Sequence, residues 1–79
     1  MITLKNLVKD GNLIRTDYIG HDNKTGHIVY DIAADNVVEK TYSESENDET
    51  HHSFSKAIVA IKKLIEFNTF PNTYRYVWF

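Results

Sequence analysis

Apolar and polar side chains alternate along two segments near the middle of the chain, and a period of two is typical of a strand with one buried face. In residues 13–19, Ile14 and Tyr18 fall on one face and Arg15 and Asp17 on the other. The alternation returns in residues 28–32, after a polar connector bounded by two glycines. The pair of segments therefore predicts a β-hairpin.

Two further strands are predicted on either side of this hairpin. Residues 37–42 predict a third strand of a meander, because the preceding Ala34-Asp35-Asn36 can form a tight turn. Residues 2–8 fit either a strand or a helical turn, since Leu4, Leu7 and Val8 also have helical spacing. Asp10-Gly11, which follows, favours a type I′ hairpin turn. The first segment stays open between the two interpretations.

The second half of the chain changes its pattern. Residues 43–50 hold four acidic and no apolar side chains, which predicts a mobile loop. Apolar residues then recur at three- and four-residue spacing, which predicts one helix: Phe54, Ala57, Ile58, Ile61, Leu64 and Ile65. Ser53 suits its N-cap, and Asn68 and Pro71 are expected to end it.

The chain closes on residues 73–79, an aromatic, strand-like run without a polar tail. We expect this run to join the sheet with Tyr74, Tyr76 and Trp78 under the helix, although the reverse register would expose them. The sequence as a whole predicts one α+β domain over residues 1–79. This domain is a mostly antiparallel sheet of four or five strands with one helix packed on one face.

The predicted core combines the inward strand positions with the apolar stripe of the helix: Ile14, Tyr18, Ile28, Tyr30, Ile32, Val38, Phe54, Ala57, Ile58, Ile61, Leu64, Ile65 and Trp78. A helix is about 10 Å wide, whereas four or five strands span roughly 19–24 Å. One helix therefore leaves part of the sheet uncovered. The candidate interface residues are Leu13, Val29, Val37, Arg75, Val77 and Phe79. Either a partner covers them, or the sheet curls and long side chains do so.

Composition narrows the class of protein. The chain has 79 residues, no cysteine and a formal net charge of −2, so stability has to come from packing or oligomerisation rather than from disulfides or a thiolate zinc site. No signal-peptide pattern and no run of about 20 apolar residues is present. We expect a soluble cytoplasmic protein without a membrane segment, and the charge disfavours nonspecific nucleic-acid binding.

Candidate chemistry is sparse. His21, Asp22 and His27 could offer ligands to a metal across the hairpin, but their spacing matches no metal signature, so we expect solvated loop side chains. Residues 48–53 contain the residue types of a hydroxyl nucleophile with its base, yet sequence neighbours do not normally converge as a triad requires. No glycine-rich phosphate loop occurs. The expectation is a protein that is not an enzyme and has no cofactor.

Residues 26–32 (GHIVYDI) and 38–44 (VEKTYSE), together with the closing aromatic strand, resemble small uncharacterised proteins encoded by Gram-positive bacteria and their mobile elements. The resemblance covers most of the chain. It implies no activity, ligand or site residue.

Two functional hypotheses follow from the residues. The first is a noncatalytic protein-interaction or regulatory module that self-associates through its sheet as a homodimer, with room for an unidentified protein partner. The alternative is a single-stranded nucleic-acid binder that stacks bases on the aromatics around Arg75.

Overall fold

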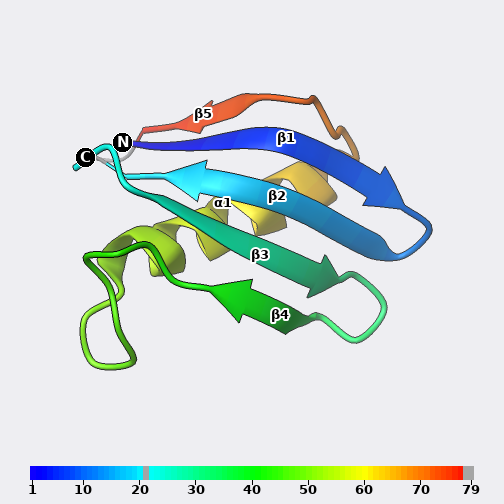
Figure 1. Cartoon of the computed structure of the whole chain (residues 1–79). Coiled ribbons are helices and arrows are strands. Elements are labelled where there is room, and N and C mark those ends of the chain that lie inside the picture. The colour runs from blue at the N-terminus through cyan, green and yellow to red at the C-terminus, as the bar shows by residue number, and fades with distance from the viewer. Residues whose placement is uncertain (21, 78–79) are drawn as a thin grey trace.

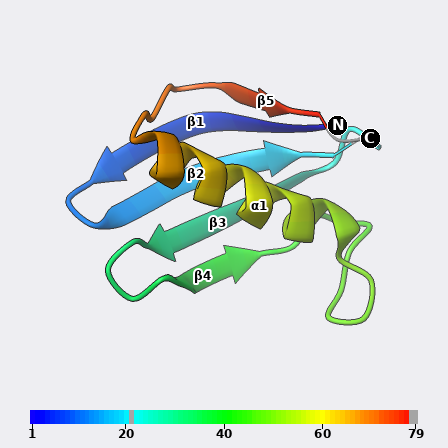
Figure 2. The same cartoon turned by 180° about the vertical axis from the view of Figure 1, so that it is seen from behind.

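Five antiparallel strands form one open sheet, and one helix packs against one of its faces (Figures 1 and 2). The computed structural model describes residues 1–20 and 22–77. Its elements, in chain order, are β1 (Ile2–Asp10), β2 (Leu13–Ile19), β3 (Thr25–Asp31), β4 (Asn36–Thr41), α1 (His52–Phe67) and β5 (Tyr74–Tyr76). The order across the sheet is β4-β3-β2-β1-β5. The predicted α+β fold is confirmed.

The first segment is a strand, and an irregularity explains its ambiguous pattern. Ile2 and Leu4 alternate inward as in any half-buried strand. The pairing of β1 with β2 then shifts between Lys5 and Val8, where Asn6 takes a left-handed φ of 55°. This bulge turns Leu7 back into the core at 4% exposure, so the apolar spacing looks helical although the segment is a strand.

The turn between β1 and β2 differs from its prediction. Asp10 pairs with Leu13, so the two-residue loop is Gly11-Asn12 and not Asp10-Gly11. The φ of Gly11 is +60°, whereas Asn12 is not among the residues with positive φ. A positive φ at the first central position alone is the geometry of a type II′ turn, not of type I′.

Helix α1 connects the two edges of the sheet by crossing its face diagonally (Figure 2). Its contacts are mainly with β1 and β2. As predicted, it ends at Asn68, whose φ of 54° is left-handed. The N–H groups of Asn68 and Thr69 donate to the carbonyls of Ile65 and Leu64 at 3.1 and 3.2 Å, which is the Schellman pattern. The predicted N-cap, Ser53, is wrong: the helix begins at His52.

The core lies between the sheet and α1 and contains these buried apolar residues: Ile2, Leu4, Leu7, Ile14, Tyr18, Ile28, Tyr30, Phe54, Ala57, Ala60, Ile61 and Leu64. Three predicted members are only partly buried: Ile32, Ile58 and Ile65. Val38 was wrongly placed, since 55% of it is exposed. A register shift in β4 sets Val37, not Val38, opposite the inward-facing Tyr30. Trp78 lies outside the described residues.

Candidate functional site

The off-centre position of α1 leaves the β4 side of the sheet open. Strand β4 pairs with β3 on one side, and no described strand covers its other side. All four residues of β4 that follow Val37 are exposed. An edge strand presents unpaired N–H and C=O groups, which can template pairing with another strand. With six residues, β4 is longer than β5, the three-residue strand at the other edge of the sheet, and it offers the longer row of backbone groups.

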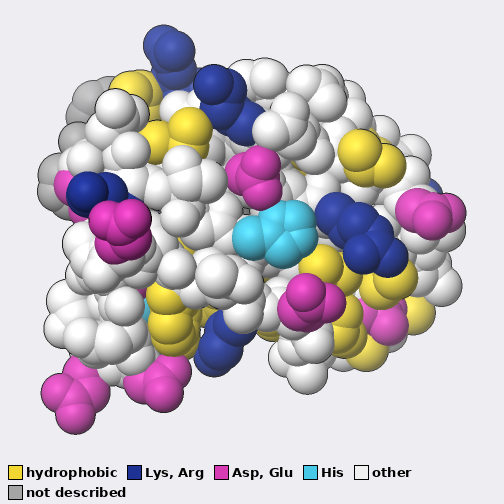
Figure 3. Space-filling view, in the orientation of Figure 1, with side chains coloured by type: hydrophobic (Ala, Val, Ile, Leu, Met, Phe, Trp, Pro, Cys, Tyr) yellow, Lys and Arg dark blue, Asp and Glu magenta, His cyan; other side chains and the backbone are white. Residues whose placement is uncertain are grey.

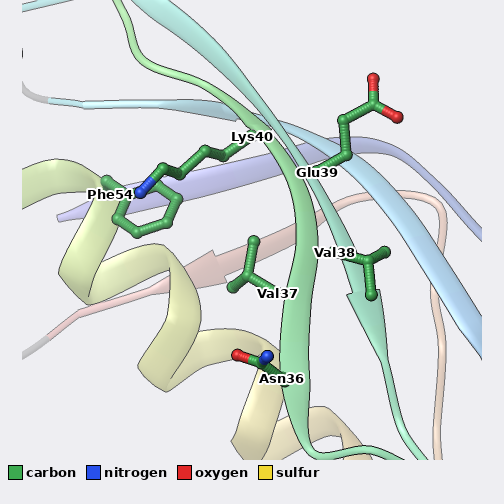
Figure 4. Close-up of a pocket in the computed structure, with 6 residues that line it drawn as sticks. All are labelled: Asn36, Val37, Val38, Glu39, Lys40 and Phe54. Carbon is green, nitrogen blue, oxygen red and sulfur yellow. The ribbon is translucent and has the colours of Figure 1, made fainter.

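A hollow lies beside this edge. It has a volume of about 320 Å³ and is lined by five residues of β4 and by Phe54 of α1: Asn36, Val37, Val38, Glu39, Lys40 and Phe54. Figure 4 shows Val37 and Lys40 on the side of the strand that faces Phe54, whereas Val38 and Glu39 point to the opposite side. We call this hollow the β4 groove. The wall on the helix side combines the apolar Val37 and Phe54 with the polar Asn36 and the cationic Lys40.

The cationic side chain of Lys40 lies over two aromatic rings. The ammonium of Lys40 lies 5.0 Å from the ring centroid of Tyr42 and 5.6 Å from that of Phe54, within the range of cation–π attraction. A hydrogen bond with the Tyr42 side chain, together with the nearby charges of Tyr42 and Asp48, holds the pKa of Lys40 above its ordinary value. Lys40 therefore stays charged at neutral pH at the mouth of the groove.

The wall beneath Lys40 is a packed aromatic cluster centred on Phe54. Its ring lies edge-on to Tyr42 at 5.1 Å, to His51 at 5.9 Å and to Tyr18 at 6.1 Å. Tyr42 and His51 are also stacked at 5.6 Å. Each edge-to-face contact adds roughly 0.5–1.5 kcal/mol beyond area burial. These ring contacts hold Phe54 in place in the wall of the groove.

Glu46 fastens the acidic loop to this cluster. Its Oε1 accepts hydrogen bonds from the Tyr18 hydroxyl at 2.6 Å and the Ser43 hydroxyl at 2.8 Å, and its Oε2 accepts one from the backbone N–H of Phe54 at 2.8 Å. The carboxylate thereby caps the first turn of α1, the role predicted for Ser53. The mobility predicted for residues 43–50 stays a prediction, but this loop has a defined anchor.

Protonation equilibria agree with this arrangement. Burial opposes ionisation of Glu46, but the hydrogen bonds from Tyr18, Phe54 and Ser43 outweigh it and hold its pKa below the ordinary range. Burial first, and then the bond to Glu46, raise the pKa of the Tyr18 hydroxyl. The pair is therefore a charged acceptor with a neutral donor, which is a strong type of hydrogen bond.

The other face of the sheet has a different character. Figure 3 shows basic, acidic, apolar and histidine side chains mixed on it. Asp17 accepts a hydrogen bond from the amide of Asn6 at 3.0 Å and lies 2.9 Å from Nδ1 of His27. The bond from Asn6 first, and then His27, lower the pKa of Asp17. This open face resembles an ordinary solvated surface more than an apolar interface.

The predicted interface residues do not form one surface. Val29 is only 3% exposed, between Arg15 and Glu39 of the neighbouring strands, so it can offer no area to a partner of the folded chain. Leu13, the first residue of β2, is partly buried and pairs with Asp31 of β3. Val37 lies in the β4 groove.

The remaining candidates belong to the other edge of the sheet. Arg75 and Val77 are exposed beside or within β5, and Phe79 lies outside the described residues. Tyr74 and Tyr76 are partly buried and pack against the core, in the predicted register. Core contact occupies ring surface that base stacking would need.

The described residues contain no cluster of side chains suited to bind a metal ion. Across positions 1–20 and 22–77, no three His, Asp or Glu side chains are grouped so that they could hold a metal ion; His21 lies outside this range. The sequence pattern did not predict that Glu46, Lys40 and Phe54 lie together in one site. The only available signal was the acidic character of the segment that precedes the helix.

Comparisons with protein-family models, with curated proteins and with solved structures give no match. Within the described residues, no helix is both long and apolar enough to cross a membrane.

Proposed function

We propose that this protein is a noncatalytic interaction module that self-associates through the β4 edge of its sheet into a two-fold homodimer. The observation that carries the proposal is the open edge itself. Strand β4 is six residues long, pairs on one side, and exposes 55% of Val38. Pairing with a second strand would satisfy its free backbone groups and cover this apolar side chain.

The side chains of β4 favour one antiparallel register. A two-fold axis that passes between Val38 and Glu39 sets Val37 opposite Lys40 of the second copy, and these residues share the helix side of the strand (Figure 4). It also sets Val38 opposite Glu39 of the second copy. An axis through Glu39 or Lys40 would instead place like charges directly opposite, which is unfavourable.

The dimer is expected to be weak. An edge of six residues is small against the roughly 1,600 Å² that a standard stable interface buries. We expect a concentration-dependent equilibrium in the micromolar range, which suits a regulatory protein. The lack of cysteine is compatible with the reducing cytoplasm, where we place this function.

The test is the absolute mass in solution, measured by size-exclusion chromatography with light scattering over a dilution series. The wild type should pass from dimer to monomer on dilution, and Val38→Asp should be monomeric throughout with unchanged stability in urea. Val59→Asp is the matched control, because Val59 is also exposed, at 38%, but lies on α1. A monomeric wild type at every concentration, or a dimeric Val38→Asp, would refute the proposal.

A further inference from the structure

We propose that the β4 groove binds an extended segment of another protein in which a carboxylate side chain lies two residues away from an apolar side chain. The segment would add to the sheet as a strand beside β4, with the apolar side chain over Val37 and Phe54 and the carboxylate at Lys40. This is strand addition, in which backbone hydrogen bonds supply affinity and pockets for alternate side chains supply specificity.

The spacing follows from the bulge in β4. Glu39 pairs with Val29, and Val37 pairs with Tyr30, so Val38 is the additional residue. Val37 and Lys40 are consequently the successive positions that face the helix, although two residues, Val38 and Glu39, lie between them in the sequence. A regular partner strand presents successive same-face side chains at i and i+2, about 6.6–6.8 Å apart. An i, i+2 pair therefore meets both groove positions.

The charge of the occupant follows from Lys40. It is the cation that lines the groove, held at the aromatic wall by Tyr42 and Phe54. Glu39, the acidic lining residue, points to the opposite side of the strand (Figure 4), and Asp48 influences Lys40 only through its charge. A carboxylate in the groove would gain a charge-assisted hydrogen bond, whereas a basic side chain would meet like charge.

A bulge and charged side chains are also devices that keep an edge strand from pairing indiscriminately. They make pairing selective for a strand with complementary charge. A second copy of this chain would present its Val37 and Lys40 to the same positions, without a carboxylate. An acidic segment complements the groove better, and we expect it to displace the second copy. The inference uses the edge of the proposed dimer but does not depend on the dimer.

The probe is an acetylated and amidated nine-residue peptide, Val-Thr-Val-Thr-Glu-Thr-Val-Thr-Val, in which a valine lies two residues to either side of the central glutamate. Twin peptides carry glutamine or lysine at the centre. Each is titrated into the ¹⁵N-labelled full chain, and backbone amide shifts report both the site and the affinity. We expect shifts at β4 and at the start of α1, and binding of the glutamate peptide about five- to tenfold tighter than that of its glutamine twin.

Two variants assign the preference to Lys40. In Lys40→Glu the order should reverse, so that the lysine peptide binds more tightly than the glutamate peptide. Lys62→Glu makes the same charge change at an exposed position of α1 and should keep the wild-type order. Dispersed spectra verify that both variants are folded.

The proposal is overturned by equal affinities for the three peptides, by shifts confined to β5 or to the open face, or by no binding at millimolar peptide. Its failure is distinguishable from that of the dimer, because mass reports self-association and the shifts report the groove. A monomer that binds the glutamate peptide refutes only the dimer. A dimer that ignores it refutes only the acidic occupant.

Discussion

Removing the Glu46 carboxylate should destabilise the whole domain although the residue lies in an irregular loop. Glu46→Ala takes away the acceptor for the Tyr18 hydroxyl, the Ser43 hydroxyl and the Phe54 backbone N–H. Tyr18 is fully buried, so its hydroxyl cannot turn to bulk water for a replacement. Phe54 lies in the first turn of α1, where its N–H has no acceptor within the helix.

The magnitude can be worked from these contacts. Loss of a helix cap costs about 1 kcal/mol, and a buried donor left without its charged acceptor costs roughly 1–3 kcal/mol. We expect these two losses together to lower the free energy of unfolding by about 2 kcal/mol. This is the sum of the lower values, which we choose because Glu46 is partly exposed. For a domain of this length that is a shift in Tm of roughly 8–16 °C.

The assay is urea unfolding, read by the midpoint at constant m-value. Glu44→Ala is the matched control, because Glu44 lies in the same loop and forms an exposed ion pair with Lys24 at 3.3 Å. It should cost less than about 0.5 kcal/mol. If Glu46→Ala and Glu44→Ala unfold within about 0.5 kcal/mol of each other, the capping role is refuted.

The pH dependence gives an independent check on Glu46. Its pKa is lower in the folded chain than the ordinary value of 4.5, so it contributes stability above pH 4.5 that is lost as the pH falls through the folded pKa. Glu46→Gln should flatten this loss below pH 4.5. An unchanged slope would contradict the assignment.

Two predictions concern the sheet. Gly26→Ala should cost about 1–3 kcal/mol in urea unfolding, because a Cβ there would lie 2.3 Å from the ring of Tyr18; a loss below about 0.5 kcal/mol would show that the ring yields freely. The folded pKa of Asp17 is below its ordinary value of 3.8, so its contribution is present above pH 3.8 and lost as the pH falls through the folded pKa. Asp17→Asn should therefore reduce the slope of stability with pH in that range without altering mass, and identical slopes would exclude a contribution from its bonds to Asn6 and His27.

The site was harder to predict than the fold. Lys40 and Phe54 are 14 positions apart by their numbers and meet because the loop between them folds back onto β2. Nothing in the local pattern marks Glu46 among four acidic residues as the one that bonds to Tyr18. Such contacts depend on how elements dock, which a local pattern does not contain.

By itself the sequence determined the helix and the strands of the central hairpin, whereas residues 2–8 stayed open between a strand and a helical turn. Alternation in residues 13–19 and 28–32, helical spacing from Phe54 to Ile65 and the stop at Asn68 are local consequences of burying one face of each element. Tertiary structure decided the rest: the bulges at Asn6 and Val38, and the strand order that places β5 beside β1. The physical reason is that a one-residue shift reverses every side chain that follows, and only pairing with a neighbouring strand decides whether that shift occurs.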